Sequence, residues 1–193
     1  TYLEEARKLK AIALDKTGTI TEGKPKLVEW LVVDSTADKT EVAMAALSLA
    51  ASSDHPVSKA IAAGLSADAA RKAGTAKVEL APQAVEGFAA LVGRGVQGVI
   101  QGQTYALGNH RLIEERKQCS PGLETLLKSQ EEAGRTVTLL ASVSAVLALF
   151  AVADTIKESS KAAVSELKAL GVTPVMLTGD NSATARALAV QAG

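Results

Sequence analysis

Cysteine, histidine and long hydrophobic runs are all scarce in this sequence. Its single cysteine, Cys119, excludes an internal disulfide bond and is typical of a protein in a reducing compartment. Its only two histidines lie far apart, so we expect no structural zinc site from this chain alone. The longest apolar stretch, residues 145–153, is strand-sized and falls well short of the roughly 18 residues that a membrane-spanning helix needs.

A net charge of either sign is also lacking. Acidic and basic residues number 21 each, so electrostatics favours neither nucleic acid nor an anionic membrane surface as a partner. The first ten residues do not resemble a signal peptide. Hydrophobic residues, by contrast, make up 47% of the 193 positions, which is enough to bury the core of one large domain or two small ones. We expect a soluble, cytosolic-type segment, and its last residues, which look like the end of a helix, indicate an excerpt of a longer chain.

The predicted elements differ between the ends of the chain and its middle. Both ends alternate strands and helices, as parallel α/β units do, whereas alternating, glycine-rich segments in the middle predict an antiparallel sheet flanked by helices. Gln101 and Gly102 are expected to form a hairpin turn, and Thr40 to cap a helix that begins there. Extended segments are expected at residues 10–15, 26–30, 78–108, 135–153 and 172–177, and helices at 40–52, 55–65, 109–117, 121–134, 157–170 and after Asp180.

An insertion of one domain into another explains this order most simply. Residues 1–32 and 152–193 are then two segments of one α/β domain, and residues 33–151 form a second, α+β domain with an antiparallel sheet. The hinges between them are expected near residues 32–34 and 151–154.

A carboxylate ends the first strand, at the position where parallel α/β domains bind ligands. Asp15 lies at its carboxyl end, and Thr178, Gly179 and Asp180 follow the strand at residues 172–177. Such a carboxylate can attack phosphorus and form an aspartyl phosphate, while Gly18 permits a tight turn that aims N–H groups at phosphate oxygens. The alternative is that Asp15 only caps a turn, since Asp, Thr and Gly are common turn residues. In the functional interpretation, Thr17 and Thr178 offer hydroxyl groups and Lys16 offers positive charge.

Several short motifs occur in an order that points to a known family. "DKTGT" (residues 15–19), continued by "TEGKP", resembles the phosphorylation motif of P-type ATPases, and "LTGDN" (177–181) resembles the second motif of the same domain. "DHP" (54–56), "GRG" (93–95) and "GN" (108–109) look like the nucleotide-domain signature of the heavy-metal-transporting branch. These matches span nearly the whole chain.

The resemblance implies a fold and a role for each matched residue. The fold is a partial, Rossmann-like phosphorylation domain of the haloacid-dehalogenase type with an inserted α+β nucleotide-binding domain. Asp15 would be phosphorylated by ATP and, with the carbonyl of Thr17, would hold Mg²⁺. Lys16, Thr178, Gly179 and Asp180 would line the phosphate site, His55 would contact adenine, and Gly93, Gly95, Gly108 and Asn109 would shape the pocket.

The same resemblance implies partners and a location. ATP would bind here, the transmembrane and actuator domains of the same parent protein would contact this region, and the transported metal would bind elsewhere. The region would lie at the cytoplasmic face of a membrane, with no nucleic acid involved. The sequence around "DHP" is more similar to exporters of zinc, cadmium, cobalt or lead than to copper ones.

The sequence also departs from the family pattern, and two alternatives stay open. Ala50 replaces an adenine-contacting glutamate, and the family's later Gly-Asp-Gly-x-Asn-Asp motif is not included, so we expect the chain to bind ATP without useful turnover. A haloacid-dehalogenase-type phosphatase is one alternative, but Thr17 occupies the position of its second aspartate, and threonine is a poor proton carrier near neutral pH. The other is a nucleotide-binding module without catalysis. His55 can also be a simple helix-start residue, and Arg94 is expected to be solvated.

Overall fold

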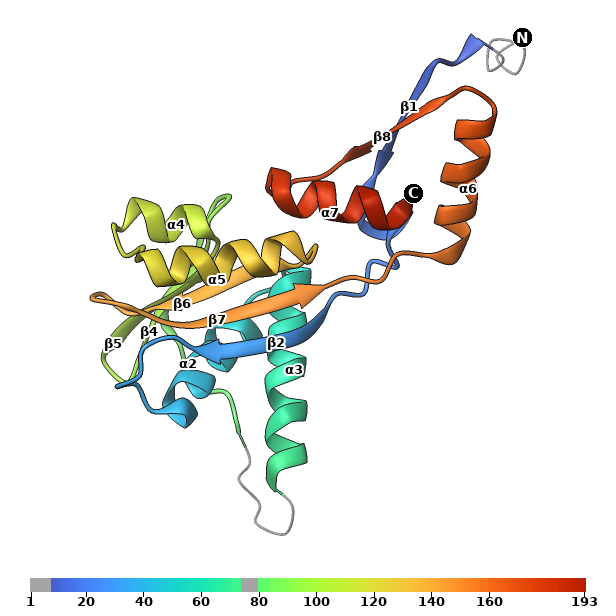
Figure 1. The fold of residues 1–193 in the computed structure, drawn as a ribbon. Helices are drawn as coiled ribbons and strands as arrows, with labels where there is room; N and C mark the ends of the chain where they lie inside the picture. Colours follow the sequence, from blue (N-terminus) through green and yellow to red (C-terminus); the bar gives the residue numbers. More distant parts are fainter. Residues whose placement is uncertain (1–7, 74–79) are drawn as a thin grey trace.

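The computed structural model describes residues 8–73 and 80–193, so residues 1–7 of the expected first domain and 78–79 of the expected antiparallel region lie outside it. The described residues form two sheets joined by two neighbouring chain segments (Figure 1). The strands are β1 (Ala11–Asp15), β2 (Lys26–Val32), β3 (Glu86–Leu91), β4 (Gly95–Ile100), β5 (Gln103–Gly108), β6 (Thr136–Ala141), β7 (Val146–Ala153) and β8 (Thr173–Leu177). The helices are α2 (Lys39–Ala51), α3 (Pro56–Ala73), α4 (His110–Glu115), α5 (Pro121–Glu132), α6 (Glu158–Ala169) and α7 (Ser182–Ala192).

The two ends of the chain build the smaller sheet. β1 and β8 pair in parallel, and α6 and α7 lie beside them (Figure 1). Ile20, Ile156 and Leu188 form the small core of this part. β1 is at most half-buried, and within the described residues only β8 pairs with it. Leu177 of β8 is likewise 53% exposed.

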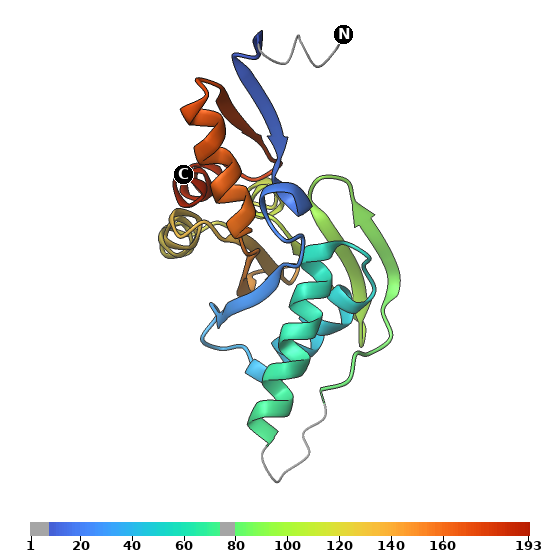
Figure 2. The ribbon, with the colours of Figure 1, turned by 90° about the vertical axis from the view of Figure 1, so that its right-hand side faces the viewer.

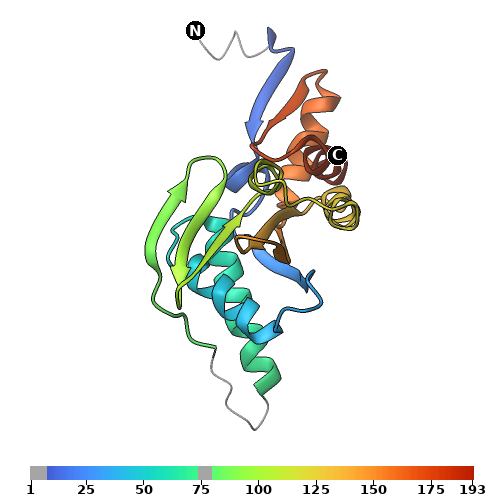
Figure 3. The ribbon, with the colours of Figure 1, turned by 90° about the vertical axis from the view of Figure 1, so that its left-hand side faces the viewer.

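The middle of the chain builds an antiparallel sheet in the order β2-β7-β6-β5-β4-β3, as predicted for this region. Helices α2 and α3 pack on one face and α4 and α5 on the other. Strand β7 is apolar along its whole length because both of its faces are covered. Leu140 and Phe150 pack toward α2 and α3, whereas Leu139 and Leu149 pack toward α4 and α5. Figures 2 and 3 show the small sheet with α6 at one end of the molecule and α3 extending to the other.

Most of the expected turns and helix ends are confirmed. Gln101 and Gly102 have φ angles of 50° and 76° and close the two-residue hairpin between β4 and β5. Gly134 and Gly171, both at φ 76°, follow α5 and α6. Thr40 does not cap α2, however: the carboxylate of Asp38 accepts the N–H groups of Thr40 and Glu41 at 2.8 and 3.0 Å, since this carboxylate reaches two free donors of the first turn.

The division between the two sheets does not follow the expected boundary at residues 32–34. β2 pairs with β7 from Lys26 to Val32 and is therefore an integral strand of the six-stranded sheet. The two connecting segments lie before β2 and after β7. A hydrogen bond from the N–H of Glu22 to the carbonyl of Thr155 (2.8 Å) joins them. The carboxylate of Asp154 also accepts the N–H groups of Gly23 and Lys24. A boundary drawn by sheets thus falls near residues 21–25 and 154–157.

Candidate functional site

The residues of the predicted phosphate site lie where β1 and β8 end. Asp15 is paired with Leu177 in the register of the two parallel strands. Asp15 and the segment Thr178, Gly179 and Asp180 are therefore side by side at the carboxyl edge of this sheet, as the motifs predicted. Asp15 is exposed, and its carboxylate has no hydrogen bond or ion pair within the described residues. It is available to a ligand.

A wide turn, Lys16–Ile20, carries the chain away from Asp15. Gly18 has φ +78°, a conformation that side chains other than that of glycine rarely adopt. The carbonyl of Lys16 accepts both the N–H and the hydroxyl of Thr21, at 3.0 and 3.1 Å. From α6, Lys157 Nζ donates to the carbonyl of Gly18 at 2.5 Å and Ser160 Oγ to that of Thr19 at 3.0 Å. The turn is thus held by its own backbone and by the start of α6.

Asp180 is the most connected side chain of this edge. Its carboxylate accepts a 2.7 Å ion pair from Lys16 and a hydrogen bond from Thr178 Oγ1 at 2.9 Å. Thr136, at the start of β6, donates to its other oxygen at 3.2 Å. The Lys16 and Asp180 side chains are only 14% and 12% exposed, so their charges largely neutralise each other. Lys16 was expected to offer free positive charge, but in this structure that charge is directed at Asp180.

His55 stands at the entrance to α3 and is exposed. Its ring Nδ1 accepts the N–H of Val57 at 3.3 Å, which satisfies one of the free donors of the helix's first turn. This bond is what the helix-start alternative predicts. It leaves Nε2 of the ring for a ligand, because that nitrogen has no partner within the described residues.

Gly95 and Gly108 are neighbours across β4 and β5, and the structure gives them a packing role. A Cβ atom on Gly95 would lie 2.2 Å from the carbonyl oxygen of Leu107, and one on Gly108 would lie 2.5 Å from that of Arg94. Gly93 differs: it has φ +67°, and a Cβ there would meet nothing within 4 Å. Asn109 connects these residues, since its amide donates to the carbonyl of Gly93 at 2.9 Å and its oxygen accepts the N–H of Leu112 at the start of α4.

Arg94 is not simply solvated. Its Nε lies 2.9 and 2.8 Å from the two carboxylate oxygens of Glu115, and its Nη2 lies 2.7 Å from Oε1, so two nitrogens of the fork-shaped guanidinium face this carboxylate. The hydrogen bond from Arg94 lowers the pKa of the Glu115 carboxyl. Ala50, which replaces the expected glutamate, lies on α2, is fully buried in the core and does not line the candidate site.

One cleft brings all the predicted site residues together. Its volume is about 1050 Å³, and it lies between the edge of the small sheet and the β4–β5 side of the large one. Lining it are the predicted catalytic and nucleotide-binding residues: Asp15, Lys16, Thr17, His55, Gly93, Gly95, Gly108, Asn109, Thr178, Gly179 and Asp180.

The cleft also contains residues that sequence motifs did not indicate. Thr136, Glu131 and Asp154 line it, and burial raises the pKa of the Glu131 carboxyl. Glu131 and Thr136 belong to no motif, and their part in the cleft depends on the way α5 and β6 meet α7. Asp154 could have been found from the sequence, because it is a carboxylate that directly follows the apolar run of β7.

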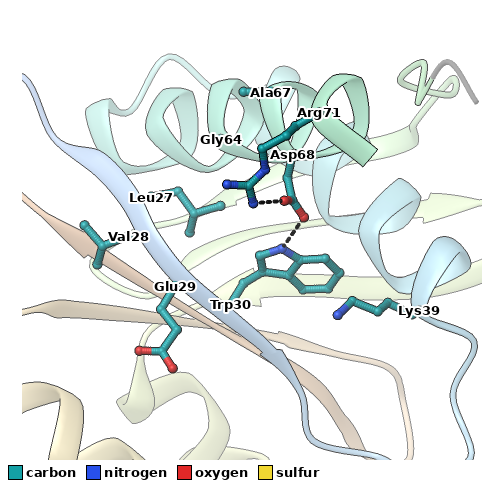
Figure 4. Close-up of a pocket in the computed structure, with 9 residues that line it drawn as sticks. All are labelled: Leu27, Val28, Glu29, Trp30, Lys39, Gly64, Ala67, Asp68 and Arg71. Atoms are coloured by element: carbon teal, nitrogen blue, oxygen red, sulfur yellow. Dashed lines mark hydrogen bonds and ion pairs between the residues drawn. The ribbon is translucent and has the colours of Figure 1, made fainter. Parts of the chain in front are cut away.

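A second cavity, of about 490 Å³, lies between β2 and α3 and contains none of the predicted residues (Figure 4). Trp30 stacks on Phe150 with ring centroids 5.9 Å apart, and the ammonium of Lys39 lies 4.7 Å from its ring. Its indole N–H donates to Asp68, which also pairs with Arg71 at 2.7 Å. Trp30, Asp68 and Arg71 are paired with one another, and Glu29 pairs with Arg135 at 2.7 Å. The larger cleft, which contains the predicted residues, is therefore the candidate site.

Within residues 8–73 and 80–193, no helix is long and apolar enough to cross a membrane.

Comparison with known proteins agrees with this geometry. Residues 9–193 match the family model of the haloacid dehalogenase-like hydrolases. A probable cadmium-transporting ATPase of Alkalihalophilus pseudofirmus is 34% identical over 195 residues, covering 100% of this chain and 26% of that protein. A probable copper-importing P-type ATPase A of Enterococcus hirae is 38% identical over 191 residues, covering 99% of this chain and 24% of that protein. The chain therefore spans about a quarter of the length of these relatives.

Solved structures give the same result for the fold. A crystal structure of a zinc-transporting PIB-type ATPase matches 99% of this chain and 29% of its own, with a TM-score of 0.61 and 32% identity. The catalytic domain of a CPx-ATPase matches 99% of this chain and 61% of its own, with a TM-score of 0.65 and 20% identity, which supports the fold alone. The predicted fold class is confirmed. The chain belongs to the haloacid dehalogenase-like hydrolase family, and the relatives that it matches along its length are heavy-metal P-type ATPases.

Proposed function

We propose that this chain is the ATP-binding and phosphorylation region of an ATP-driven heavy-metal transporter, and that Asp15 accepts the phosphoryl group. One observation carries the proposal: Asp15, at the end of β1, and His55, Gly93 and Asn109, on the large sheet side, line the same cleft. With a volume of about 1050 Å³, this cleft is at the upper end of the range for small-molecule and cofactor sites. A nucleotide bound by the large sheet can then present its terminal phosphate to Asp15.

In the proposed reaction, a carboxylate oxygen of Asp15 attacks the γ-phosphorus of ATP. A bond forms between that oxygen and phosphorus, the bond to the bridging oxygen breaks, and ADP leaves with the electron pair. Asp15 suits this role because it is exposed and unpaired, whereas Asp180 is held by Lys16, Thr178 and Thr136. The phosphate is then positioned by polar side chains that hold one another in place, those of Lys16, Thr178 and Asp180. Positioning is the larger part of catalysis in phosphoryl transfer.

Mg²⁺ is the metal that this reaction calls for, and the donor set fits it in part. Mg²⁺ prefers oxygen ligands and is often held by one or two carboxylates together with substrate phosphates. The carboxylate of Asp15 and the carbonyl of Thr17 would hold it here, and the ion would neutralise charge on the phosphate oxygens. Among the described residues, no group of three acidic, histidine or cysteine ligands includes Asp15.

The large sheet and its helices form the nucleotide-binding domain in this proposal. His55 would stack or hydrogen-bond with adenine through the part of its ring that Val57 does not occupy. Gly93 leaves open space on the cleft side and Asn109 fixes the loop that carries it, so the backbone of this loop can approach a ligand closely. Because β2 pairs with β7, we assign β2 to this domain and place its boundaries near residues 21–25 and 154–157.

The larger protein would be an integral membrane transporter with this region at its cytoplasmic face. Its transmembrane and actuator domains would be the partners of this chain, and the transported ion would bind among the membrane helices. Relatives named as cadmium-transporting ATPases and a zinc-transporting structure support zinc or cadmium as the cargo, although relatives named for copper match over the same residues.

A phosphatase of the same family is the competing function. It would need a proton-carrying side chain two residues after Asp15, and Thr17 occupies that position. The test is hydrolysis of ATP and of p-nitrophenyl phosphate by the complete protein and by Asp15→Asn. We expect metal-stimulated ATP hydrolysis that Asp15→Asn abolishes while ATP binding is retained. Efficient Asp15-dependent hydrolysis of p-nitrophenyl phosphate without any metal-stimulated ATP hydrolysis would favour the phosphatase.

A further inference from the structure

Three potential metal ligands meet at one end of the α4–α5 helix pair, at the rim of the cleft. His110 is the first residue of α4, Cys119 lies in the connection to α5, and Glu124 is in the first turn of α5. Their positions are set by two helix caps, because Asn109 Oδ1 accepts the N–H of Leu112 and Ser120 Oγ accepts that of Leu123. The count of histidines and cysteines in the sequence did not reveal this cluster, because glutamate supplies one of its three ligands.

The geometry is close to that of a coordination site. One ligand atom from each of the three side chains lies within 4.8 Å of the other two. His110 Nε2 is 2.8 Å from Glu124 Oε1, and Glu114 Oε1 is 3.9 Å from the same nitrogen. Metal–ligand bonds of about 2.0–2.3 Å in a tetrahedral site place ligand atoms roughly 3.3–3.8 Å apart, so side-chain adjustments of about 1 Å suffice.

The chemistry of the ligands selects the metal. One sulfur, one imidazole nitrogen and one carboxylate oxygen suit Zn²⁺ and related borderline-soft ions, whereas Mg²⁺ prefers oxygen ligands alone. Without metal, burial and then Glu124 raise the pKa of the Cys119 thiol to about 11, so the thiol is protonated at neutral pH. Metal binding would release this proton to solvent and would use His110 as a neutral ring through Nε2. Glu114 and Glu131, which also face His110, add negative charge around the cation.

We propose that His110, Cys119 and Glu124 form a binding site for one divalent cation of the zinc and cadmium type. Glu114 or a water molecule would complete the coordination. This site is separate from the phosphate edge of the cleft and from any ion path in a membrane, and it does not depend on the proposed function. His110 directly follows Asn109 and lines the cleft itself, so the bound ion would lie at the rim of the nucleotide site.

The test is a titration of the 193-residue protein with Cd²⁺, followed by the ultraviolet charge-transfer band of a cadmium–thiolate bond. Cys119 is the only cysteine, so the band reports this site alone. We expect saturation at one Cd²⁺ per chain, with loss of the band in Cys119→Ser. His110→Gln and Glu124→Gln should weaken binding at least ~10-fold, since loss of even an indirect partner of a metal ligand commonly costs that much. His55→Gln, which removes the other histidine, is the matched control and should bind as the wild type does.

Circular dichroism establishes that each variant is folded. If His110→Gln proves unfolded, the more conservative Glu124→Gln, in the exposed first turn of α5, serves in its place. The proposal is overturned if the wild type shows no thiolate band at stoichiometric Cd²⁺. It is equally overturned if the folded His110 or Glu124 variant binds Cd²⁺ as tightly as the wild type, because a single thiol then explains the binding. ATP affinity is measured separately, so failure here leaves the proposed function untouched.

Discussion

Replacing Gly95 by alanine should force β4 and β5 apart on the nucleotide side of the cleft and destabilise the protein. The new Cβ would lie 2.2 Å from the carbonyl oxygen of Leu107 and 2.4 Å from Cα of Gly108, and both are backbone atoms of β5. Gly95 also has φ +144°, which disfavours any side chain. Overpacking costs typically about 1–3 kcal/mol and a strained backbone of order 1–3 kcal/mol, so we expect a loss of about 2–6 kcal/mol in the free energy of unfolding.

Two other glycines provide matched controls for this prediction. Gly102, in the hairpin turn away from the cleft, and Gly93, on the cleft, have φ angles of 76° and 67° and open space around a new Cβ. Alanine at either position should bring only the left-handed strain, roughly 1–2 kcal/mol. Since about 1 kcal/mol corresponds to roughly 2–4 °C in a chain of this length, Gly95→Ala should melt roughly 5–10 °C below Gly102→Ala.

The assay is thermal unfolding by circular dichroism, followed by ATP calorimetry at a temperature where all three variants are folded. Gly93→Ala should lower ATP affinity more than Gly102→Ala at similar stability, because only Gly93 lines the cleft. If Gly95→Ala melts within about 2 °C of Gly102→Ala, the close approach of β4 and β5 does not explain the glycine at position 95.

Three further predictions follow from the fold and the cleft. His55→Ala should weaken ATP binding about tenfold, or roughly 1.4 kcal/mol; an unchanged dissociation constant would show that His55 only accepts the N–H of Val57 at the start of α3. Residues 24–154, expressed alone, should fold and bind ATP, whereas residues 34–150, which lack β2, should be clearly less stable in the same denaturant series; equal stability would show that β2 is dispensable. Gly64→Ala should destabilise the protein by about 1–3 kcal/mol, since its Cβ would lie 2.4 Å from that of Leu27 (Figure 4), and the double variant Gly64→Ala/Leu27→Gly, which removes the contacted Cβ, should lose less stability than the two single variants lose together if this contact is the cause.

The phosphate edge of the cleft was predictable because its residues are local to two strand ends. Asp15 and Thr178 each follow an apolar run, and parallel strands bring such ends to one edge of a sheet. The hairpin at Gln101 and Gly102 was predictable for a similar reason, since turn residues act over a few positions.

Features that depend on distant parts of the chain were not predictable from the sequence. β2 was recognisable as an extended segment, but nothing in residues 26–32 shows that its partner is β7, more than 100 positions away. The ion pairs of Lys16 with Asp180 and of Arg94 with Glu115 likewise join segments whose proximity depends on the completed fold. The sequence shows that Ala50 replaces a glutamate of the family pattern, but not that this residue is buried in the core, because its burial depends on how α2 packs on the sheet.

Phosphate transfer to Asp15 is the central claim, and trapping the phosphorylated protein tests it most directly. The complete transporter would be incubated with Mg²⁺ and ATP labelled at the γ-phosphate, quenched in acid and assayed for bound label. Asp154→Asn, which changes another carboxylate lining the cleft, is the matched control for Asp15→Asn. We predict acid-stable label in the wild type and in Asp154→Asn, and none in Asp15→Asn. Label that persists in Asp15→Asn would contradict the assignment of Asp15 as the phosphorylated residue.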